Sequence, residues 1–299
     1  MFFRLNIMVS IITINYNGYN DTCELIDSLY KNETVDFEVI VIDNASKDNE
    51  AVKLAERYPQ IKAIRSEVNL GFAGGNNLGY DNASGDYILF MNNDMIVTGP
   101  FIEPLIRRFE SSDSIGLLSP KIKYYYAPDT IQYAGFTGFS KFALRTHLIG
   151  EKCKDDGNFD NADVTASTHG ACMFTSRGLM DKVGKMTDIY FLFYEEHDWS
   201  MRFREAGYQI WYESKSCVYH KESMTIKRGT PSRLYYLSRA RAIFTRRNTR
   251  GFNKFVSCAY LLSFSLPKQI LEFSLKGQWP MAKSVFKGFY DGFQLKIKR

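Results

Sequence analysis

Short apolar stretches alternate with helical patterns through the first hundred residues of the chain. Four of these stretches are predicted strands, at residues 9–14, 37–42, 61–64 and 87–91. Three segments between them are predicted helices, at residues 21–30, 50–58 and 76–82. Strands that are apolar on both faces and are joined through helices form a parallel sheet covered on both sides. The alternation therefore predicts an α/β fold with a mostly parallel central sheet.

The pattern is less regular after Pro100. Helices are predicted at residues 101–110, 177–183 and 195–206, and Gly207 ends the last of them. The stretches YQIWYE (208–213) and SCVYH (216–220) are predicted strands. Residues 121–165 mix short strands with polar loops, and we expect substrate-facing insertions there.

Charge is unevenly spread along the 299 residues. Residues 226–299 hold 16 Lys and Arg but only 2 Asp and Glu, whereas residues 1–225 hold 22 and 31. A basic tail on an acidic body is expected to meet an anionic surface such as a membrane or a phosphate group. Nucleic acid is not expected as a partner, because it would explain the tail but not the acidic body. We expect a catalytic domain at 1–225 and a separate C-terminal region at 226–299.

The five cysteines are widely scattered, with no CxxC pair. This spacing indicates neither a disulfide framework nor a zinc site, and it favours a reduced, cytoplasmic compartment. The apolar run near the N-terminus leads into Asn15 without a small-residue cleavage site, so we do not expect a signal peptide. The longest uncharged run in the tail, 255–267, is shorter than the roughly 20 residues of a spanning helix.

Three predicted strands end in polar clusters: Asn15-Tyr16-Asn17, Asp43-Asn44-Ala45-Ser46 and Asn92-Asn93-Asp94. In open parallel sheets, ligands bind beyond the carboxyl ends of the strands. A carboxylate beside a bound phosphate needs a cation between them, and Mg²⁺ or Mn²⁺ is the usual one. Asp94 is therefore a candidate metal ligand. The alternative is a turn residue that caps its own backbone.

A glycine-rich segment, 69–79, precedes the third predicted helix. Such a turn can bring backbone N–H groups close to an anion. Neither the G-x-G-x-x-G spacing nor the P-loop pattern occurs, which argues against a dinucleotide site and a P-loop NTPase. A tight connection between a strand and a helix would explain the glycines equally well.

The stretch YFLFYEEHDWSMR (190–202) places three acids at a helix start. Helix capping and an Asp198–Arg202 pair would account for them. However, apolar neighbours and like charges raise a carboxyl pKa, which improves a general base. We therefore interpret Asp198 and Arg202 as structural, and one of Glu195 and Glu196 as chemical.

Four histidines occur in the chain, and His220 differs from the others because it ends a predicted strand. At that position it is a candidate to bind a cation or contact a phosphate. His147, His169 and His197 have no comparable context, and we expect His197, which lies between acids, to be solvated.

Seven stretches match a known family in order: SIITINYNGYN, VIDNASKDN, NLGFAGGNNLGY, GDYILFMNND, GACMFTSRGLMDKVGKM, FLFYEEHDWSMRFREAGY and VYHKESMT. The chain resembles family 2 inverting glycosyltransferases of the GT-A fold over residues 9–225. It is especially similar to bacterial rhamnosyltransferases of O-antigen and other surface polysaccharides. The resemblance implies a Rossmann-like GT-A domain with a mostly parallel sheet, followed here by a helical C-terminal extension.

The resemblance also implies roles for single residues. Nucleotide and donor contacts fall on Asn15, Tyr16, Asn17, Asp43, Asn44, Ser46, Gly71, Gly74, Asn77, Asn92, Asn93, Gly170, Ala171 and Arg239. Asp94 matches the last acid of the metal-binding DxD motif, whose first position is Asn92 here, and His220 matches a histidine near the metal and diphosphate. Glu196 matches the catalytic base, which is commonly Asp, and Glu195 is the second choice. Arg239 belongs to a segment that is similar to Arg-Asn-Arg but carries Ala240.

The implied reaction is an inverting transfer that depends on Mn²⁺ or Mg²⁺. A sugar would move from a dTDP- or UDP-sugar, with dTDP-rhamnose favoured, to a lipid-linked saccharide. The reaction would proceed by a single displacement with one general base. Two alternatives remain: a nucleotidyltransferase and a non-catalytic nucleotide-sugar-binding protein.

The last predicted helix, MAKSVFKGFYDGFQ, has one apolar face, formed by Met281, Val285, Phe286, Phe289, Tyr290 and Phe293. Lys283 and Lys287 lie off that face. Such a helix can lie in a membrane interface beside anionic lipid. We expect a peripheral protein at the inner face of the cell membrane. Packing onto the catalytic domain, or a homodimer contact, is the alternative.

Overall fold

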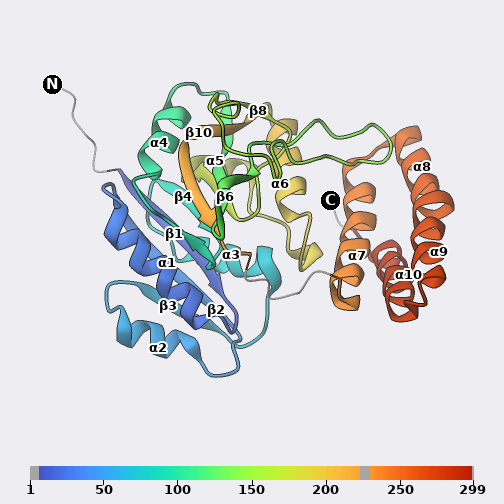
Figure 1. Ribbon diagram of the computed structural model, residues 1–299, viewed down its shortest axis with the longest axis horizontal. Coiled ribbons are helices and arrows are strands. Elements are labelled where there is room, and N and C mark those ends of the chain that lie inside the picture. Colours follow the sequence, from blue (N-terminus) through green and yellow to red (C-terminus); the bar gives the residue numbers. More distant parts are fainter. Residues whose placement is uncertain (1–6, 223–228, 298–299) are drawn as a thin grey trace.

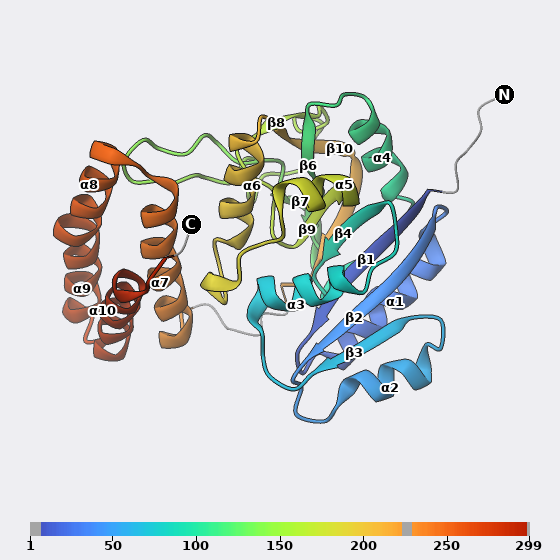
Figure 2. The same ribbon diagram turned by 180° about the vertical axis from the view of Figure 1, so that it is seen from behind.

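The computed structural model describes residues 7–222 and 229–297. An α/β body is joined to a group of helices, α7 to α10, that stands at one end of it (Figures 1 and 2). Four parallel strands form one half of the sheet, in the order β3-β2-β1-β4. These are β1 (Met8–Asn15), β2 (Asp36–Asn44), β3 (Lys62–Ser66) and β4 (Tyr87–Met91). The predicted parallel arrangement is confirmed.

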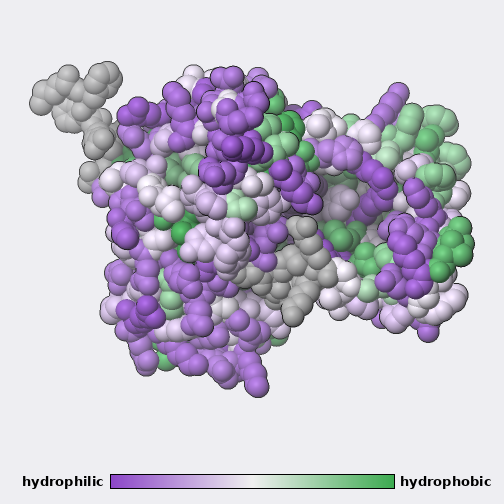
Figure 3. All heavy atoms as spheres, viewed as in Figure 1, coloured by the Kyte–Doolittle hydropathy of each residue, from purple (hydrophilic) through white to green (hydrophobic). Residues whose placement is uncertain are grey.

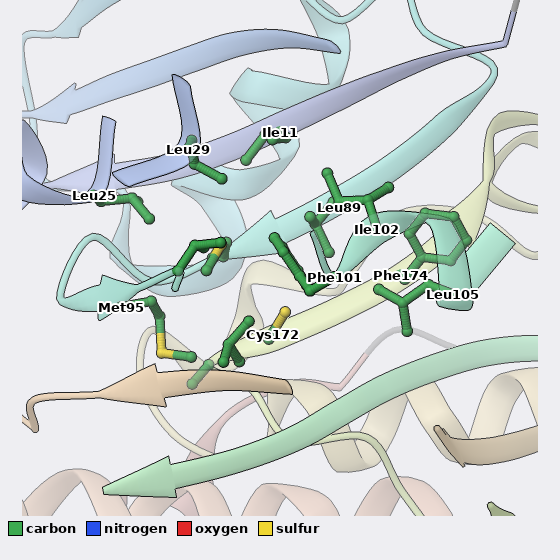
Figure 4. Close-up of a cluster of buried hydrophobic side chains, with 14 of the residues drawn as sticks. Ile11, Leu25, Leu29, Leu89, Met95, Phe101, Ile102, Leu105, Cys172 and Phe174 are labelled. Atoms are coloured by element: carbon green, nitrogen blue, oxygen red, sulfur yellow. The ribbon is translucent and has the colours of Figure 1, made fainter. Parts of the chain in front are cut away.

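Three helices connect these strands: α1 (Tyr19–Asn32), α2 (Glu50–Arg57) and α3 (Gly71–Asp81). Side chains of β1 alternate between two cores, because successive residues of a strand point to opposite faces. Ile11 packs with α1 and α2, whereas Ile12 packs with α3 and with α6 (Glu195–Glu205). The α1-side core is shown in Figure 4, where Leu25 and Leu29 point toward the sheet.

Helix α3 begins at Gly71, five residues before the predicted start. The expectation of a glycine-rich turn was wrong because these glycines serve close packing inside the helix. A Cβ at Gly75 would meet Ile14 Cδ1 at 2.8 Å, and one at Gly79 would meet Ile12 Cγ2 at 2.3 Å. Small residues therefore let α3 lie directly on the sheet.

The second half of the sheet is mixed, in the order β9-β6-β10-β5 beyond β4. Its strands are β5 (Met95–Ile96), β6 (Ile115–Tyr124), β9 (Cys172–Ser176) and β10 (Gln209–His220), with β7 (Ala127–Tyr133) and β8 (Asp163–Thr165) beside them. Helices α4 (Ile102–Glu110) and α5 (Arg177–Val183) belong to this half. The two predicted strands at 208–213 and 216–220 are one strand, β10, with a register shift between Glu213 and Cys217.

The C-terminal helices are α7 (Pro231–Asn248), α8 (Gly251–Tyr260), the π-helical η2 (Leu261–Ser265), α9 (Leu266–Leu275) and α10 (Trp279–Gln294). Helix α10 packs closely along α7, where a Cβ at Gly288 would meet the Tyr235 carbonyl oxygen at 2.4 Å. Val285 and Phe289 are buried, whereas Phe286 and Tyr290 are exposed. The prediction that all apolar residues of α10 face lipid is therefore wrong for Val285 and Phe289. These two side chains pack inside the group of C-terminal helices.

Within the described part of the chain, no helix has both the length and the apolar character needed to cross a membrane. The segment between β7 and β8 reaches toward the C-terminal helices (Figure 1). Phe139 and Leu144 of this segment pack in one cluster with Phe244 of α7. Part of the region predicted to face substrate thus holds the C-terminal helices in place.

Replacement of Gly71 by alanine tests the close contact at the start of α3. Gly71 has φ +71°, and an added Cβ would meet the Phe191 carbonyl oxygen at 2.3 Å. Gly71→Ala should lower the free energy of unfolding by about 3 kcal/mol, measured by chemical denaturation. Gly178→Ala is the control, because its Cβ meets nothing within 4 Å, and it should be neutral or stabilising. Equal stability of the two variants would contradict this account.

Candidate active site

The carboxyl ends of β1 and β2 are tied together by their own polar side chains. Asn15 is fully buried, and its Nδ2 donates to Ser46 Oγ at 3.3 Å and to Glu50 Oε2 at 2.7 Å. Asn15 Oδ1 accepts from Thr22 Oγ1 at 2.8 Å. Ser46 Oγ also accepts from the Asn17 backbone N–H at 2.8 Å. Asn15 and Ser46 therefore shape the turn, whereas Tyr16, 36% exposed, and Asn17 are the exposed members of the predicted trio.

Asp43, the predicted reader of the base, has no exposed surface. Its carboxylate accepts from the backbone N–H groups of Ser46 and Ala51 and, at 2.8 Å, from Arg65 Nη1. Burial alone would raise the pKa of Asp43, but the hydrogen bonds from Ser46, Ala51 and Arg65 outweigh it and lower that pKa. Direct base contact by Asp43 stays a prediction, and Arg65 is the more exposed member of the pair.

The start of α3 is held by Asn44, which is buried. Asn44 Nδ2 donates to the Gly71 carbonyl at 3.1 Å, and its Oδ1 accepts from the Leu70 N–H at 2.8 Å. Asn77 Nδ2 donates to the Met186 carbonyl at 2.7 Å, and Gly74 lies within the helix. These predicted donor-site residues fix α3 in place, and their contact with a nucleotide stays a prediction.

Asp94 and His220 are brought side by side by backbone pairing. Strand β5 follows Asp94 directly, and its Met95 pairs with His220 of β10 in antiparallel register. The Lys221 N–H donates to the Asp94 carbonyl at 3.0 Å. His220 Nε2 lies 3.1 Å from Asp94 Oδ1, and both side chains are nearly buried. Two residues that the sequence singled out separately thus form one pair.

Gln132 of β7, which the sequence did not single out, fixes the orientation of the His220 ring. Its Nε2 donates to Glu222 Oε1 at 2.9 Å, and its Oε1 lies 2.8 Å from His220 Nδ1. An ionised carboxylate only accepts hydrogen bonds, so the Gln132 oxygen faces the ring and Nδ1 carries the proton. In a neutral imidazole, the Nε2 lone pair then points toward the Asp94 carboxylate.

Two electron-rich atoms that face each other in this way are suited to hold a cation. Two ligands at right angles, each ~2.1 Å from an octahedral ion, lie about 3.0 Å apart. The 3.1 Å between His220 Nε2 and Asp94 Oδ1 is compatible with this geometry, and it is also the length of a direct hydrogen bond between the two groups. In the residues that the structure describes, no group of three or more His, Cys, Asp or Glu side chains is arranged to hold a metal. A cation here would therefore take its remaining ligands from water and a bound phosphate.

The segment Ser167 to Ala171 connects this pair to the start of α6. The Asn92 N–H donates to the Ala171 carbonyl at 2.9 Å. A Cβ at Gly170 would lie 3.6 Å from Glu196 Cδ, so this glycine borders Glu196. His169 lies in the same segment, and burial, with His220 and His197 adding to it, lowers its pKa to about 3. One short segment thereby contacts both Asn92 and Glu196, and a single site shared by Asp94 and Glu196 stays a prediction.

The two candidate bases differ in their surroundings. Glu195 is buried, and its Oε1 has no hydrogen-bond partner among the residues that the structure describes. Burial, followed by repulsion from Glu196, holds the pKa of Glu195 well above its usual range. The Glu196 side chain is 20% exposed and lies beside Gly170. The predicted rise in carboxyl pKa is thus found at Glu195, while Glu196 is the more accessible carboxylate.

His197 is not solvated, which corrects the prediction. It is packed edge-on against Phe136 and Phe139, and its Nδ1 lies 2.8 Å from Ser167 Oγ. Burial lowers the pKa of His197, although Glu196 opposes this shift. Its Nε2 lies 3.7 Å from Glu196 Oε1. A neutral His197 side chain therefore lies directly beside the Glu196 carboxylate.

Comparison with known proteins identifies the family of this chain. The sequence model described as Glycosyl transferase family 2 matches residues 10–184, more than half of the chain.

The chain belongs to glycosyl transferase family 2.

Relatives and solved structures agree with this assignment. The low-salt glycan biosynthesis hexosyltransferase Agl10 of Haloferax volcanii is 26% identical over 208 residues, which cover 68% of this chain and 63% of that protein. The O-antigen biosynthesis protein RfbC of Myxococcus xanthus is 24% identical over 225 residues, which cover 72% of this chain but 17% of that protein. This chain therefore spans less than two thirds of the length of either relative.

Two solved structures show that the fold is shared. GalNAc-T7, crystallised with UDP, GalNAc and Mn²⁺, aligns with a TM-score of 0.61 and 13% identity, covering 93% of this chain and 59% of that one. The mannosyltransferase PcManGT from Pyrobaculum calidifontis, in complex with GDP-Man and Mn²⁺, aligns with a TM-score of 0.57 and 14% identity over 96% and 87% of the two chains. The predicted GT-A-like fold is confirmed. Glu196 and His220 lie beyond the stretch that the family 2 model matches.

The backbone that leads into Glu195 is strained in this family 2 chain. Phe191, Phe193 and Tyr194 have φ values of 69°, 70° and 73°, in a region that costs a residue with a side chain about 1–2 kcal/mol. The Phe72 N–H donates to the Phe191 carbonyl at 2.8 Å. Such strain persists only where surrounding contacts enforce it.

Helix α7 supplies many of those contacts. Tyr236 stacks on Phe191 with ring centroids 5.1 Å apart, and Arg233 lies 4.8 Å from the Phe193 ring centroid. Arg239 Nη1 donates to the Tyr190 carbonyl at 2.7 Å. In the structure Arg239 thus holds the loop, and its predicted contact with phosphate stays a prediction.

The buried Asp198 carboxylate joins α6 to α7. It accepts from Tyr190 Oη, Arg247 Nε and Asn248 Nδ2, each at 2.9 Å. The predicted pair with Arg202 forms at 3.8 Å. The structural interpretation of Asp198 holds, and two of its three nearest partners, Arg247 and Asn248, come from α7.

Replacement of Arg247 tests this junction. Arg247→Gln would leave a buried carboxylate short of a cation, so the free energy of unfolding should fall by about 3 kcal/mol in chemical denaturation. Arg250→Gln is the matched control, because the Arg250–Glu205 pair at 3.6 Å is exposed on both sides, and it should cost less than about 0.5 kcal/mol. Similar small losses in both variants would show that the junction contributes little.

The raised pKa of Glu195 makes stability depend on pH. The unfolded chain loses this proton near its usual pKa of about 4.3, before the folded protein does, so stability falls as pH rises from there toward the folded pKa. Glu195→Gln removes this fall. Relative to the wild type, the variant should therefore gain stability as the pH rises above about 4.3. Denaturation curves across that range measure the difference, and a constant difference would contradict the assignment.

Proposed function

We propose that this protein is a metal-dependent, inverting glycosyltransferase that moves a sugar from a nucleoside-diphosphate donor to an acceptor hydroxyl. The observation that carries the proposal is the linkage of the Asp94–His220 pair to Glu196 through the segment Ser167 to Ala171. Membership of family 2 supports it, as do neighbours crystallised with Mn²⁺ and UDP or GDP-Man.

Asp94 and His220 would hold a divalent cation, which when bound offsets the charge on the departing diphosphate. Gln132 keeps the His220 ring turned with Nε2 toward that position. Glu196 accepts the proton of the acceptor hydroxyl as the oxygen attacks the anomeric carbon. A diphosphate leaves without protonation by a carboxylic acid, so a single base serves one displacement, which inverts the configuration. A retaining hydrolase instead needs two carboxyl groups about 5 Å apart.

We extend the proposal to the substrates. The donor is a dTDP- or UDP-sugar, with rhamnose the favoured sugar, and the acceptor is a lipid-linked saccharide in surface polysaccharide synthesis. The resemblance to rhamnosyltransferases supports the donor. The names of the relatives, which refer to a low-salt glycan and to O-antigen, support the pathway. Fold alone would allow many other substrates.

Substitution of Glu196 tests the catalytic assignment. Glu196→Gln keeps the shape of the side chain but cannot accept the proton, so the transfer rate should fall by about 10²–10⁴-fold while UDP binding is retained. Glu205→Gln, at the exposed end of the same helix, is the control and should keep full activity. Rates are measured by release of nucleoside diphosphate, with UDP affinity from calorimetry. Undiminished transfer by the Glu196 variant would reject its role as the base.

The same assay separates the other two functions. A nucleotidyltransferase would release pyrophosphate rather than nucleoside diphosphate. A non-catalytic sensor would bind the donor without turnover even when a lipid-linked acceptor is supplied.

A further inference from the structure

Helices α8, η2 and α9 follow one another without a break from Gly251 to Leu275, and they carry an exposed apolar surface. Six large apolar side chains on them are between 45% and 80% exposed: Phe252, Phe255, Leu262, Phe264, Leu271 and Leu275. We call these six residues the α8–α9 apolar face. Figure 3 shows hydrophobic colour at the end of the molecule where α8 and α9 lie.

The other side of this helical run makes the contacts inside the molecule. Ser257, Leu261 and Ser265 recur every fourth residue and are buried. Arg241 Nη1 of α7 donates to Ser265 Oγ at 2.8 Å. Helix α9 itself has no buried residue, although half of it is Leu, Ile or Phe. Leu266 and Phe273 of α9 pack against buried residues of the helical group, whereas Leu271 and Leu275 remain exposed, and such an apolar surface is unusual for a soluble protein.

Positive charge accompanies the apolar face along the same helices. Arg250, Lys254, Lys268 and Lys276 are basic, and Glu272 is the single acid of α8, η2 and α9. Glu272 pairs with Lys276 at 3.0 Å. An apolar stripe flanked by basic side chains is the pattern of a helix that lies in a membrane interface, where the apolar part enters the acyl boundary and the cations meet anionic headgroups.

We propose that the α8–α9 apolar face docks onto an anionic lipid bilayer, with the helical run lying along the membrane surface. Trp279, 59% exposed and four residues beyond α9, adds an aromatic ring of the kind enriched at that interface. A second copy of the chain is a poorer occupant, because pairing would bring two basic helical runs together. This inference does not depend on the proposed catalytic activity.

Vesicle sedimentation of the 299-residue chain tests the docking. The wild type is mixed with vesicles of phosphatidylcholine alone and with vesicles that also contain phosphatidylglycerol. The triple variant Phe255→Ser, Leu271→Ser, Leu275→Ser removes three large exposed apolar groups. Binding of the wild type to the anionic vesicles should exceed that of the triple variant by at least about tenfold. Binding of the wild type should also exceed its binding to neutral vesicles and should fall as salt is raised.

A matched control uses exposed apolar residues outside the face. Val68→Ser and Tyr126→Ser change side chains that are 63% and 79% exposed on the α/β body, and vesicle binding should be unchanged. Thermal melts confirm that each variant is folded. Equal sedimentation of the triple variant and the wild type would overturn the proposal. It would also be overturned if light scattering showed a dimer that the triple substitution dissociates, because the face would then be a contact between copies.

Discussion

The short pairing of β5 with β10 is the constraint on which the rest of the candidate site depends. It sets Met95 opposite His220 and so places Asp94 beside the imidazole. Met95 is buried in the core on the α1 side of the sheet, where it points toward Cys172 (Figure 4). The buried Met95 side chain therefore fixes the position of the neighbouring Asp94. A pair of proposed ligands held in this way would be preorganised before any cation or phosphate binds, which would reduce the reorganisation that binding requires.

The C-terminal helices also contact the candidate site. Asp198, Phe191 and Tyr190 each contact α7, so the strained backbone that carries Glu195 and Glu196 is held from outside the α/β body. Helix α7 also contacts η2, through Arg241 and Ser265, and packs closely along α10. Helix α7 therefore contacts both the loop that leads into the proposed base and the helical run that carries the proposed membrane surface. This arrangement would hold the proposed base at a fixed position relative to an acceptor at the bilayer.

Local sequence patterns were sufficient to predict the parallel half of the sheet and the clustering of polar residues at strand ends. The chemistry of those residues was harder to predict, because it depends on distant partners. Asn15 is hydrogen-bonded to Glu50, and Asp43 is hydrogen-bonded to Arg65. Nothing near Asn15 or Asp43 in the sequence indicates these partners. Gln132 lies 88 residues from His220, inside an irregular region, and no periodicity marks it. His197 was expected in water because its neighbours are acids, whereas the aromatic residues that bury it come from the segment after β7.

The measurement that tests the central claim most directly is Mn²⁺ binding in the presence of UDP, followed by the loss of the free-ion signal in electron paramagnetic resonance. If Asp94 and His220 hold the cation beside a diphosphate, the wild type should bind one Mn²⁺ per chain in a UDP-dependent way. Asp94→Asn and His220→Gln should each weaken that binding by at least about tenfold, while the surface variant Asp113→Asn should not. Unchanged Mn²⁺ affinity in the Asp94 and His220 variants would contradict the account.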